Sequence, residues 1–246
     1  MPDQPSVPPT PRLIVTIGLH SSASTWVYNT VRELMIARFG GEQISAIFAE
    51  TVEEMIADRS LAGRHVVWKT HHGGPNWEAF AWLSRATAVL SVRDPRDAAV
   101  SLMQRFAVET KPAMGAIGQD CLRAMQCADA GCPVLRYEDR FFEDAETVGK
   151  LARAIGAEVS AKARARIFER YRTEAVSAFA DNLAGLSTAR VSGSVGSSQF
   201  DRVTQIHTAH IGNGRIGKWR ETLPPAQQRE ATDYFAPFLR RFGYDA

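Results

Sequence analysis

Short apolar runs alternate with longer segments of helical spacing along most of the chain. The runs are rich in valine, isoleucine and leucine, which predicts buried strands. They cover residues 13–18, 44–49, 65–71, 88–92 and 133–137. Apolar side chains three and four residues apart predict helices between and after these runs. The predicted helices cover residues 26–39, 52–61, a stretch through 82 after the turn at 73–75, 96–106, 116–129, 144–186 with a break near 156, and 225–242.

Strands that alternate with helices in this way imply βαβ units and a mostly parallel sheet flanked by helices. We therefore expect one α/β domain over residues 12–246, preceded by a flexible leader at residues 1–11, which contain five prolines. The segment 187–213 is rich in serine, glycine and threonine and has weak periodicity, so it predicts a lid or binding loop.

Composition narrows the class of protein. Apolar residues make up 45% and charged residues 23% of the 246 residues, as in average soluble domains, which excludes disordered, collagen-like and coiled-coil chains. The net charge of +2 gives no bulk support for a nucleic-acid partner. Without a long apolar run we expect no membrane association. Three cysteines without a C-x-x-C pair favour reduced thiols and a cytoplasmic location. No His/Cys/carboxylate spacing predicts a metal site.

The turn after the first predicted strand has the context of a phosphate-binding loop. Ligands of open α/β sheets bind beyond the carboxyl ends of the strands. Backbone N–H groups and hydroxyls of the segment from Gly18 to Thr25 are suited to ring an anion, although an ordinary serine-rich helix cap is the alternative. In the Walker pattern, Ala23 and Ser24 replace the second glycine and the lysine. This opposes ATP chemistry and leaves the binding of a 5′-phosphate open.

Two further strand ends carry charged side chains. Arg93 ends the fourth strand, before an Asp94-Pro95 helix start, where an anion or an acidic neighbour would neutralise it. Lys69 and His71 are two residues apart on the third strand, so their side chains share a face. A cation beside an imidazole lowers its pKa and favours the basic form, which suits a general base. A solvated strand end is the alternative.

Together these segments resemble the sulfotransferases that use 3′-phosphoadenosine 5′-phosphosulfate (PAPS). The resemblance covers about residues 12–222, and the segment from Arg93 to Ser101 is its most specific part. The matching motifs, in order, are Ser24-Thr25-Trp26, Lys69-Thr70-His71, Arg93 to Ser101, Tyr137-Glu138-Asp139 and Gly214 to Trp219.

The resemblance implies in-line transfer of a sulfuryl group from PAPS to a hydroxyl or amine of a small-molecule acceptor, leaving 3′-phosphoadenosine 5′-phosphate (PAP), without a metal. His71 would be the general base, and Lys69 would stabilise charge on the transferring group. The implied donor-binding residues are Ser21, Ser22, Ala23, Ser24 and Thr25 for the 5′-phosphate, Trp26 and Tyr137 for adenine, Arg93 and Ser101 for the 3′-phosphate, and Asn213, Gly214 and Arg215 in a closing segment.

The chain departs from the family at two places. Ser21 stands where the family's loop usually has lysine or arginine, and Gly212-Asn213 stand where an Arg-Lys pair is usual. Arg215, Lys218 and His210 are candidates to supply that charge. A non-catalytic nucleotide-binding protein of the same fold is therefore an alternative function. A P-loop kinase is a second one, opposed by the missing Walker lysine.

Aromatic residues lie in the segments expected to shape the acceptor pocket, and they suggest a partly apolar cavity. They are Trp77, Phe80, Phe106 and Phe200.

Overall fold

A five-stranded parallel sheet forms the centre of the computed structural model, which describes residues 12–193, 199–208, 212 and 214–245. The strand order is β2-β3-β1-β4-β5, so β1 lies between β3 and β4. The predicted α/β class and parallel sheet are thus confirmed. The strands of this sheet are β1 (Leu13–Gly18), β2 (Ile44–Phe48), β3 (His65–Thr70), β4 (Thr87–Val92) and β5 (Val134–Arg136).

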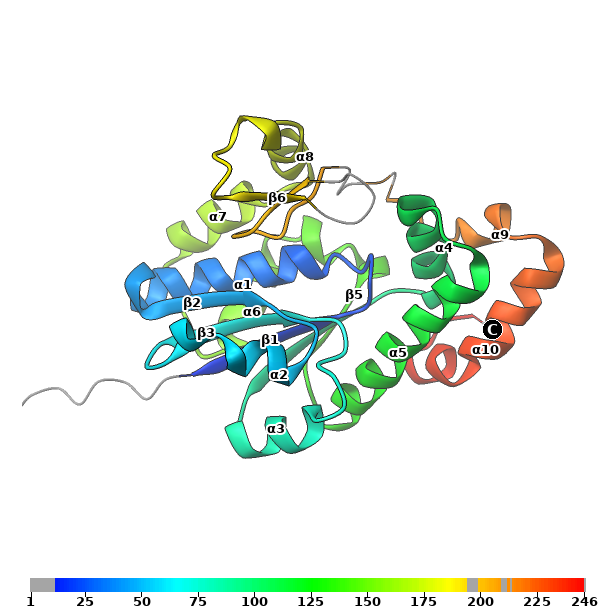
Figure 1. Ribbon diagram of the computed structural model, residues 1–246, viewed down its shortest axis with the longest axis horizontal. Helices are drawn as coiled ribbons and strands as arrows, with labels where there is room; N and C mark the ends of the chain where they lie inside the picture. Colours follow the sequence, from blue (N-terminus) through cyan, green and yellow to red (C-terminus); the bar gives the residue numbers. More distant parts are fainter. Residues whose placement is uncertain (1–11, 194–198, 209–211, 213, 246) are drawn as a thin grey trace, which may run out of the picture.

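Helices cover both faces of this sheet, and a small antiparallel hairpin lies apart from it (Figure 1). The hairpin consists of β6 (Val191–Gly193) and β7 (Gln199–Asp201). The helices are α1 (Ser24–Phe39), α2 (Val52–Ala57), α3 (Trp77–Ser84), α4 (Pro95–Phe106), α5 (Thr110–Asp129), α6 (Glu146–Ala154), α7 (Ala161–Arg170), α8 (Thr173–Asp181), α9 (Trp219–Thr222) and α10 (Pro225–Phe242). Short 3₁₀ turns occur at 41–43, 59–61, 137–139, 141–143 and 183–185.

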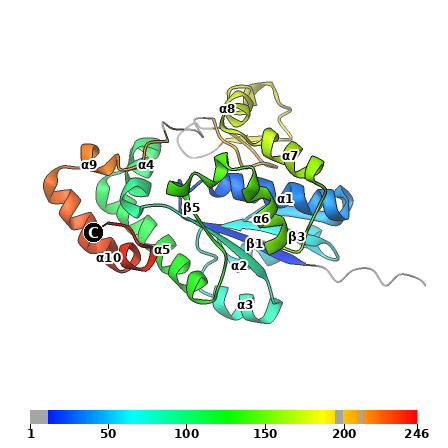
Figure 2. The ribbon, with the colours of Figure 1, turned by 180° about the vertical axis from the view of Figure 1, so that it is seen from behind.

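Successive side chains of the strands point to opposite faces and so build two cores. In β1, Ile14 packs into a core with α1, α6 and α7, whereas Val15 and Ile17 pack into a second core with α2 to α5 and α10. From behind, α6 and α7 lie beside α1 on their shared face of the sheet (Figure 2). Burial on both faces explains why these strands read as continuous apolar runs.

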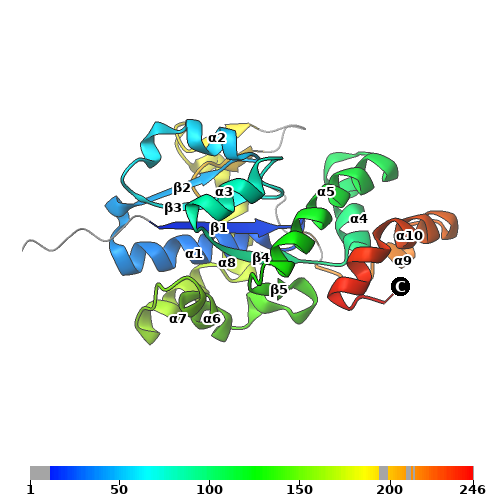
Figure 3. The same cartoon turned by 90° about the horizontal axis from the view of Figure 1, so that it is seen from below.

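The carboxyl ends of the strands share one edge of the sheet. Figure 3 shows α4, α9 and α10 beyond the carboxyl end of β1. Because β3, β1 and β4 are direct neighbours, the segments that follow them lie side by side at this edge. None of the helices in the described ranges is long and apolar enough to span a membrane.

Several predicted boundaries shift for local reasons. The predicted helix 52–61 ends at Ala57, because Asp58 accepts the Ser60 N–H and starts a separate 3₁₀ turn. The helix predicted to start at 116 starts at Thr110, since Pro112 lies in its first turn, where backbone N–H groups need no helical acceptor.

In the predicted lid segment, Arg190 forms an ion pair with the buried carboxylate of Asp201. The described residues of the segment include both strands of the hairpin, and Arg190 donates to both carboxylate oxygens of the buried Asp201 at 3.0 and 2.8 Å. The weak periodicity of the segment therefore conceals a short hairpin, and its role as a lid or binding loop stays a prediction. The predicted leader, residues 1–11, lies outside the described residues.

Candidate functional site

The loop between β1 and α1 has the backbone geometry of an anion cradle. Ser21 and Ala23 adopt left-handed backbone angles, with φ of +63° and +60°. Alternating right- and left-handed residues turn successive N–H groups into one concavity. Within the described chain the N–H groups of Ala23, Ser24 and Thr25 have no acceptor, as is usual for a helix start. These donors are available to a phosphate.

The loop hydroxyls divide into two groups. Ser22 donates from its hydroxyl and from its N–H to the Leu19 carbonyl, at 2.7 and 3.1 Å, and its Oγ lies 2.9 Å from Ser91 Oγ. Both donors of Ser22 therefore close the loop. The hydroxyls of Ser24 and Thr25 have no hydrogen-bond partner among the described residues, which leaves them free for a ligand.

Arg93 joins the loop to the closing segment. Its Nη1 donates to the Ser21 carbonyl at 3.1 Å, and its Nη2 donates to the Arg215 carbonyl at 2.7 Å. The guanidinium carbon lies 4.1 Å from the centre of the Tyr137 ring. Arg93 is only 4% exposed, yet its Nε has no partner in the described part of the chain. A buried donor without an acceptor is rare in proteins and is expected where a ligand supplies the acceptor.

A buried carboxylate holds the closing segment against α4. Asp97 accepts the N–H of Gly217 at 2.6 Å and the N–H of Trp219 at 3.0 Å, and it lies 3.7 Å from Arg93. One alternative raised for Arg93, an ion pair with an acidic neighbour, is thus present in part. The Ser101 hydroxyl donates to the Asp97 carbonyl at 2.9 Å, so in this structure it forms a hydrogen bond within α4.

The other predicted residues of the closing segment have separate positions. The Tyr137 hydroxyl donates to the Gly214 carbonyl at 3.5 Å. The exposed side chain of Arg215 forms an ion pair with Glu221. Asn213 lies outside the described residues.

Trp26 packs as a core residue in this structure. It is 8% exposed, and its ring meets the edge of Phe141 at 5.6 Å between ring centres. Stacking of Trp26 on adenine stays a prediction that requires this side chain to present a ring face.

His71 has the tautomer of a base. Its Nδ1 lies 2.6 Å from the Gly18 carbonyl, which can only accept, so Nδ1 carries the proton and Nε2 keeps its lone pair. Burial lowers the pKa of His71 well below its usual value, and the positive charges of His20 and Lys69 lower it further. The imidazole is therefore neutral.

Lys69 lies on the same face of β3. Its Nζ is 5.0 Å from the centre of the Phe48 ring, and the His71 ring is 6.0 Å from that centre. Burial lowers the pKa of Lys69 to about 8. Its charge is thus maintained near neutrality but is easily lost in alkali.

A histidine–carboxylate pair at this edge is absent from the sequence-based set of site residues. The backbone N–H and Nδ1 of His20 both donate to Asp120 Oδ2, at 2.9 and 2.7 Å. The His20 ring stacks on the His71 ring, with 3.6 Å between centres and 17° between planes. Asp120 is 1% exposed. The two partners are 100 residues apart in the sequence, so no local motif predicts that they pair.

His20, Glu50 and His71 bring possible metal-ligating atoms within 4.8 Å of one another. Imidazoles that share one ion radiate from it, because each lone pair lies in its ring plane and points at the metal. The nearly parallel rings of His20 and His71 do not converge in this way. This arrangement therefore gives no support for a metal site.

The predicted acceptor aromatics separate in space. Trp77 and Phe80 pack against Trp68, with ring centres 5.7 and 5.9 Å away, Trp77 buried in the core and Phe80 partly buried at its margin. Phe200 instead packs against His207 at 5.2 Å. Burial lowers the pKa of His207 to about 4, and the positive charges of Arg105 and Lys69 contribute to this decrease.

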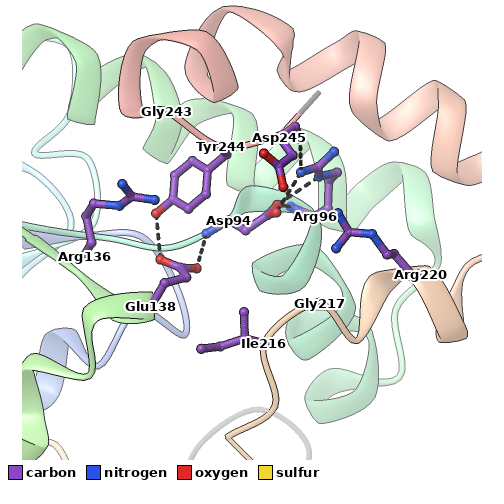
Figure 4. Close-up of a pocket in the computed structure, with 10 residues that line it drawn as sticks. All are labelled: Asp94, Arg96, Arg136, Glu138, Ile216, Gly217, Arg220, Gly243, Tyr244 and Asp245. Carbon is purple, nitrogen blue, oxygen red and sulfur yellow. Dashed lines mark hydrogen bonds and ion pairs between the residues drawn. The ribbon is translucent and has the colours of Figure 1, made fainter.

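A cavity of about 200 Å³ lies between the start of α4 and the end of the chain (Figure 4). Several of its polar groups are paired with one another, although Arg136 Nε is buried without a hydrogen-bond partner in the described chain. Asp94 Oδ2 lies 2.8 Å from Arg96, the Asp94 N–H donates to Glu138 at 2.9 Å, and the Tyr244 hydroxyl donates to Glu138 at 2.9 Å. The cavity is lined by none of the predicted catalytic or donor-binding residues.

No protein-family model matches the chain, and no curated protein sequence is significantly similar to it. Solved structures are similar in fold. Mouse sulfotransferase SULT7A1 in complex with PAP is 15% identical, with a TM-score of 0.62 over 93% of this chain and 85% of that chain. Retinol dehydratase in complex with retinol and PAP is 15% identical, with a TM-score of 0.59 over 92% of this chain and 80% of that chain. The chain therefore has the sulfotransferase fold, as its sequence motifs predict.

Proposed function

We propose that the protein transfers a sulfuryl group from PAPS to a hydroxyl or amine of a small-molecule acceptor. The observation that carries this proposal is the position and tautomer of His71. Its unprotonated Nε2 is held beside a phosphate-type loop by the hydrogen bond from Nδ1 to the Gly18 carbonyl. The likeness in fold to structures that contain PAP supports the choice of donor.

The residues present fit PAP. The free N–H groups of Ala23, Ser24 and Thr25 suit the 5′-phosphate, because a helix start attracts anions. Arg93, which lies across the loop, suits the 3′-phosphate, since its buried Nε lacks an acceptor in the described chain. An anion at Arg93 would thus satisfy a donor that the protein leaves unpaired.

His71 takes the acceptor proton onto Nε2 as the acceptor oxygen or nitrogen attacks sulfur. The new bond to sulfur forms while the bond from sulfur to the bridging oxygen breaks, and that oxygen keeps the electron pair and leaves with PAP. The buried cation of Lys69 stabilises charge on the transferring group, which is worth more in a low-dielectric site than in water.

The acceptor is a small molecule in this proposal. Two of the similar structures are complexes of retinol dehydratase, one with retinol and one with androsterone. In this chain, Phe48 lies beside both Lys69 and His71 and offers an apolar surface next to the base.

The first test is thermal unfolding with PAP, ADP or ATP at equal concentration without magnesium. A ligand present at 100 times its Kd adds about 2.7 kcal/mol of stability. We expect PAP to raise the unfolding temperature and ADP and ATP to have little effect. A preference for ATP would indicate a kinase, and no effect of PAP would refute the donor site.

Arg93→Ala tests the position of the 3′-phosphate. Each charge-assisted hydrogen bond contributes about 1.5–3 kcal/mol. The variant should therefore bind PAP much more weakly while its affinity for adenosine 5′-phosphate hardly changes. Equal losses for both ligands would show that Arg93 does not bind the 3′-phosphate.

A turnover assay separates the enzyme from its non-catalytic alternative. PAP binding without sulfuryl transfer to any phenol, alcohol or amine of a broad panel would favour the non-catalytic alternative.

A further inference from the structure

The closing segment lacks the usual Arg-Lys pair, so Arg93 is the one cation assigned so far to the proposed 3′-phosphate site. Three residues are candidates for a replacement. His210 lies outside the described residues, and the exposed side chain of Arg215 forms an ion pair with Glu221. Lys218 differs from both, because it is described and is only 9% exposed.

Lys218 lies along the side of α4 that carries Ser101. The residues before and after Lys218 both donate their N–H groups to Asp97, at 2.6 and 3.0 Å, and Lys218 Nζ donates to Gln104 Oε1 at 3.1 Å. Asp97, Ser101 and Gln104 are four and three residues apart, so they share one side of the helix. The Lys218 side chain therefore extends from Asp97 toward Gln104 on the same side of α4 as the proposed phosphate ligand Ser101.

The protein gives the buried ammonium of Lys218 little compensation for its charge. None of the described carboxylates forms an ion pair with it, and its hydrogen-bond acceptor is the neutral Gln104 amide. Burial lowers the pKa of Lys218, the charge of Arg93 lowers it further, and Asp97 offsets part of this decrease. Asp97 is also 3.7 Å from Arg93 and so is shared by the two cations. A buried cation in such surroundings is costly unless a ligand supplies the opposite charge.

We infer that Lys218 is the second cation of the 3′-phosphate site, where it replaces the missing Arg-Lys pair and binds the phosphate together with Arg93. This inference rests on the proposed function. The 3′-phosphate would accept hydrogen bonds from Lys218 Nζ and from the buried Nε of Arg93, which has no acceptor in the described chain. It would thus supply the negative charge that the surroundings of Lys218 lack.

Calorimetric titration of Lys218→Met with PAP and with adenosine 5′-phosphate tests the inference. Methionine keeps an unbranched side chain but removes the charge. We expect the variant to lose about 10- to 100-fold in affinity for PAP, the worth of one charge-assisted hydrogen bond, and to bind adenosine 5′-phosphate like the wild type. An unchanged affinity for PAP, or equal losses for the two ligands, would overturn the inference.

The matched control is Arg220→Met, which removes a positive charge two residues further along the chain. Arg220 is exposed, its guanidinium carbon lies 4.4 Å from the centre of the Trp219 ring, and it lines the cavity near the end of the chain. This variant should bind PAP as tightly as the wild type. A loss as large as that of Lys218→Met would show an effect of net charge alone, and the inference would be wrong.

Thermal unfolding without ligand distinguishes a binding role of Lys218 from a structural one. Because the charge is buried beside Arg93, the ligand-free Lys218→Met protein should unfold at or above the wild-type temperature. PAP should then raise that temperature less than it does in the wild type. A ligand-free variant that unfolds well below the wild type would show that the free protein already compensates this charge, contrary to the inference.

The wild-type protein separates this inference from the proposed function. A wild type that binds PAP, with a Lys218→Met variant that binds it equally well, overturns the role of Lys218 and leaves the proposed function intact. A wild type that binds neither PAP nor PAPS overturns the proposed function, and the role of Lys218 with it.

Discussion

Two groups of ionisable residues lie beyond the carboxyl ends of the strands, and they differ in how many of their polar atoms have a hydrogen-bond partner in the described chain. The C-terminal charge cluster consists of Asp94, Arg96, Glu138, Tyr244 and Asp245, which bond to one another (Figure 4). The strand-end cluster consists of His20, Lys69 and His71.

In the C-terminal charge cluster each strong donor has an acceptor. Arg96, 1% exposed, makes three hydrogen bonds to Asp94 with its backbone and side chain and one to the Asp245 carbonyl at 2.6 Å. In the strand-end cluster, Nε2 of His20 and of His71 have no hydrogen-bond partner in the described ranges. Asp94, Arg96 and Glu138 are thus paired with their neighbours, whereas His71, which is proposed to act on the acceptor, has an unpaired Nε2 in the described chain.

Arg93 and Arg96 show the same contrast within one turn of chain. Arg96 is fully paired, but Arg93 keeps a buried Nε without an acceptor in the described chain. The sequence pattern assigns a cation to both positions and does not distinguish their roles. Four predictions test this contrast, beginning with the largest effect.

Replacement of His71 should affect turnover alone. His71→Ala removes the open base of the strand-end cluster and should lower sulfuryl transfer by about 10²–10⁴-fold. PAP affinity, measured by calorimetry, should not change. The matched control is His72→Ala, because the His72 ring accepts the Gly74 N–H and has no proposed role in proton transfer. Wild-type turnover in His71→Ala would remove this residue from the mechanism.

Replacement of Arg96 should affect stability alone. Arg96→Ala leaves the Asp94 carboxylate buried without its cation, which costs about 3–5 kcal/mol of unfolding free energy. The folded variant should bind PAP as tightly as the wild type. Arg93→Ala is the matched comparison, with a smaller loss of stability, since Asp97 keeps two N–H donors. If Arg96→Ala instead weakened PAP binding, the division between the two clusters would fail.

Lys69 should make stability depend on pH in alkali. Burial lowers its pKa in the folded state from the usual 10.5 to about 8, so the unfolded chain binds more protons between these values. Stability therefore rises with pH across this window, by on the order of 3 kcal/mol at most. Urea unfolding at pH 7.5 and 10 should show this rise in the wild type relative to Lys69→Met. A constant difference between the two proteins would mean that Lys69 is not desolvated.

The smallest effect is expected at Ala23. A non-glycine residue at a φ of +60° is strained by about 1–2 kcal/mol. Glycine removes this strain, but it loses more backbone entropy on folding, which offsets part of the gain. Ala23→Gly should thus stabilise the protein by about 0.5–1 kcal/mol in urea unfolding. Ala107, with a φ of +52° at the end of α4, is the matched control. A gain at Ala107 but none at Ala23 would mean that the free protein does not hold the loop in this conformation.

The parts of the site that the sequence predicts are those encoded locally. The side chains of Lys69 and His71 share a face because a strand repeats every two residues, and Arg93 ends a strand because Asp94-Pro95 starts the next helix. Nothing local encodes the pairing of His20 with Asp120, which depends on the packing of α5 against β1.

Core packing decides other assignments that residue type leaves open. Aromatic rings suit a pocket and a core equally, and Trp77 is buried at 4% exposure against Trp68. The α10 bounds, in contrast, agree with the predicted 225–242, since prolines begin that helix and Gly243 ends it.

The attachment of the closing segment to Asp97 determines when the proposed nucleotide site can form during synthesis of the chain. Arg93 obtains its second carbonyl from Arg215, and Asp97 obtains its two N–H donors from Gly217 and Trp219, more than 100 residues further along the chain. A nascent chain that ends before these residues lacks one wall of the proposed nucleotide site. If the proposed function holds, PAP would bind only after most of the chain has been synthesised and folded, so PAP binding would not initiate folding.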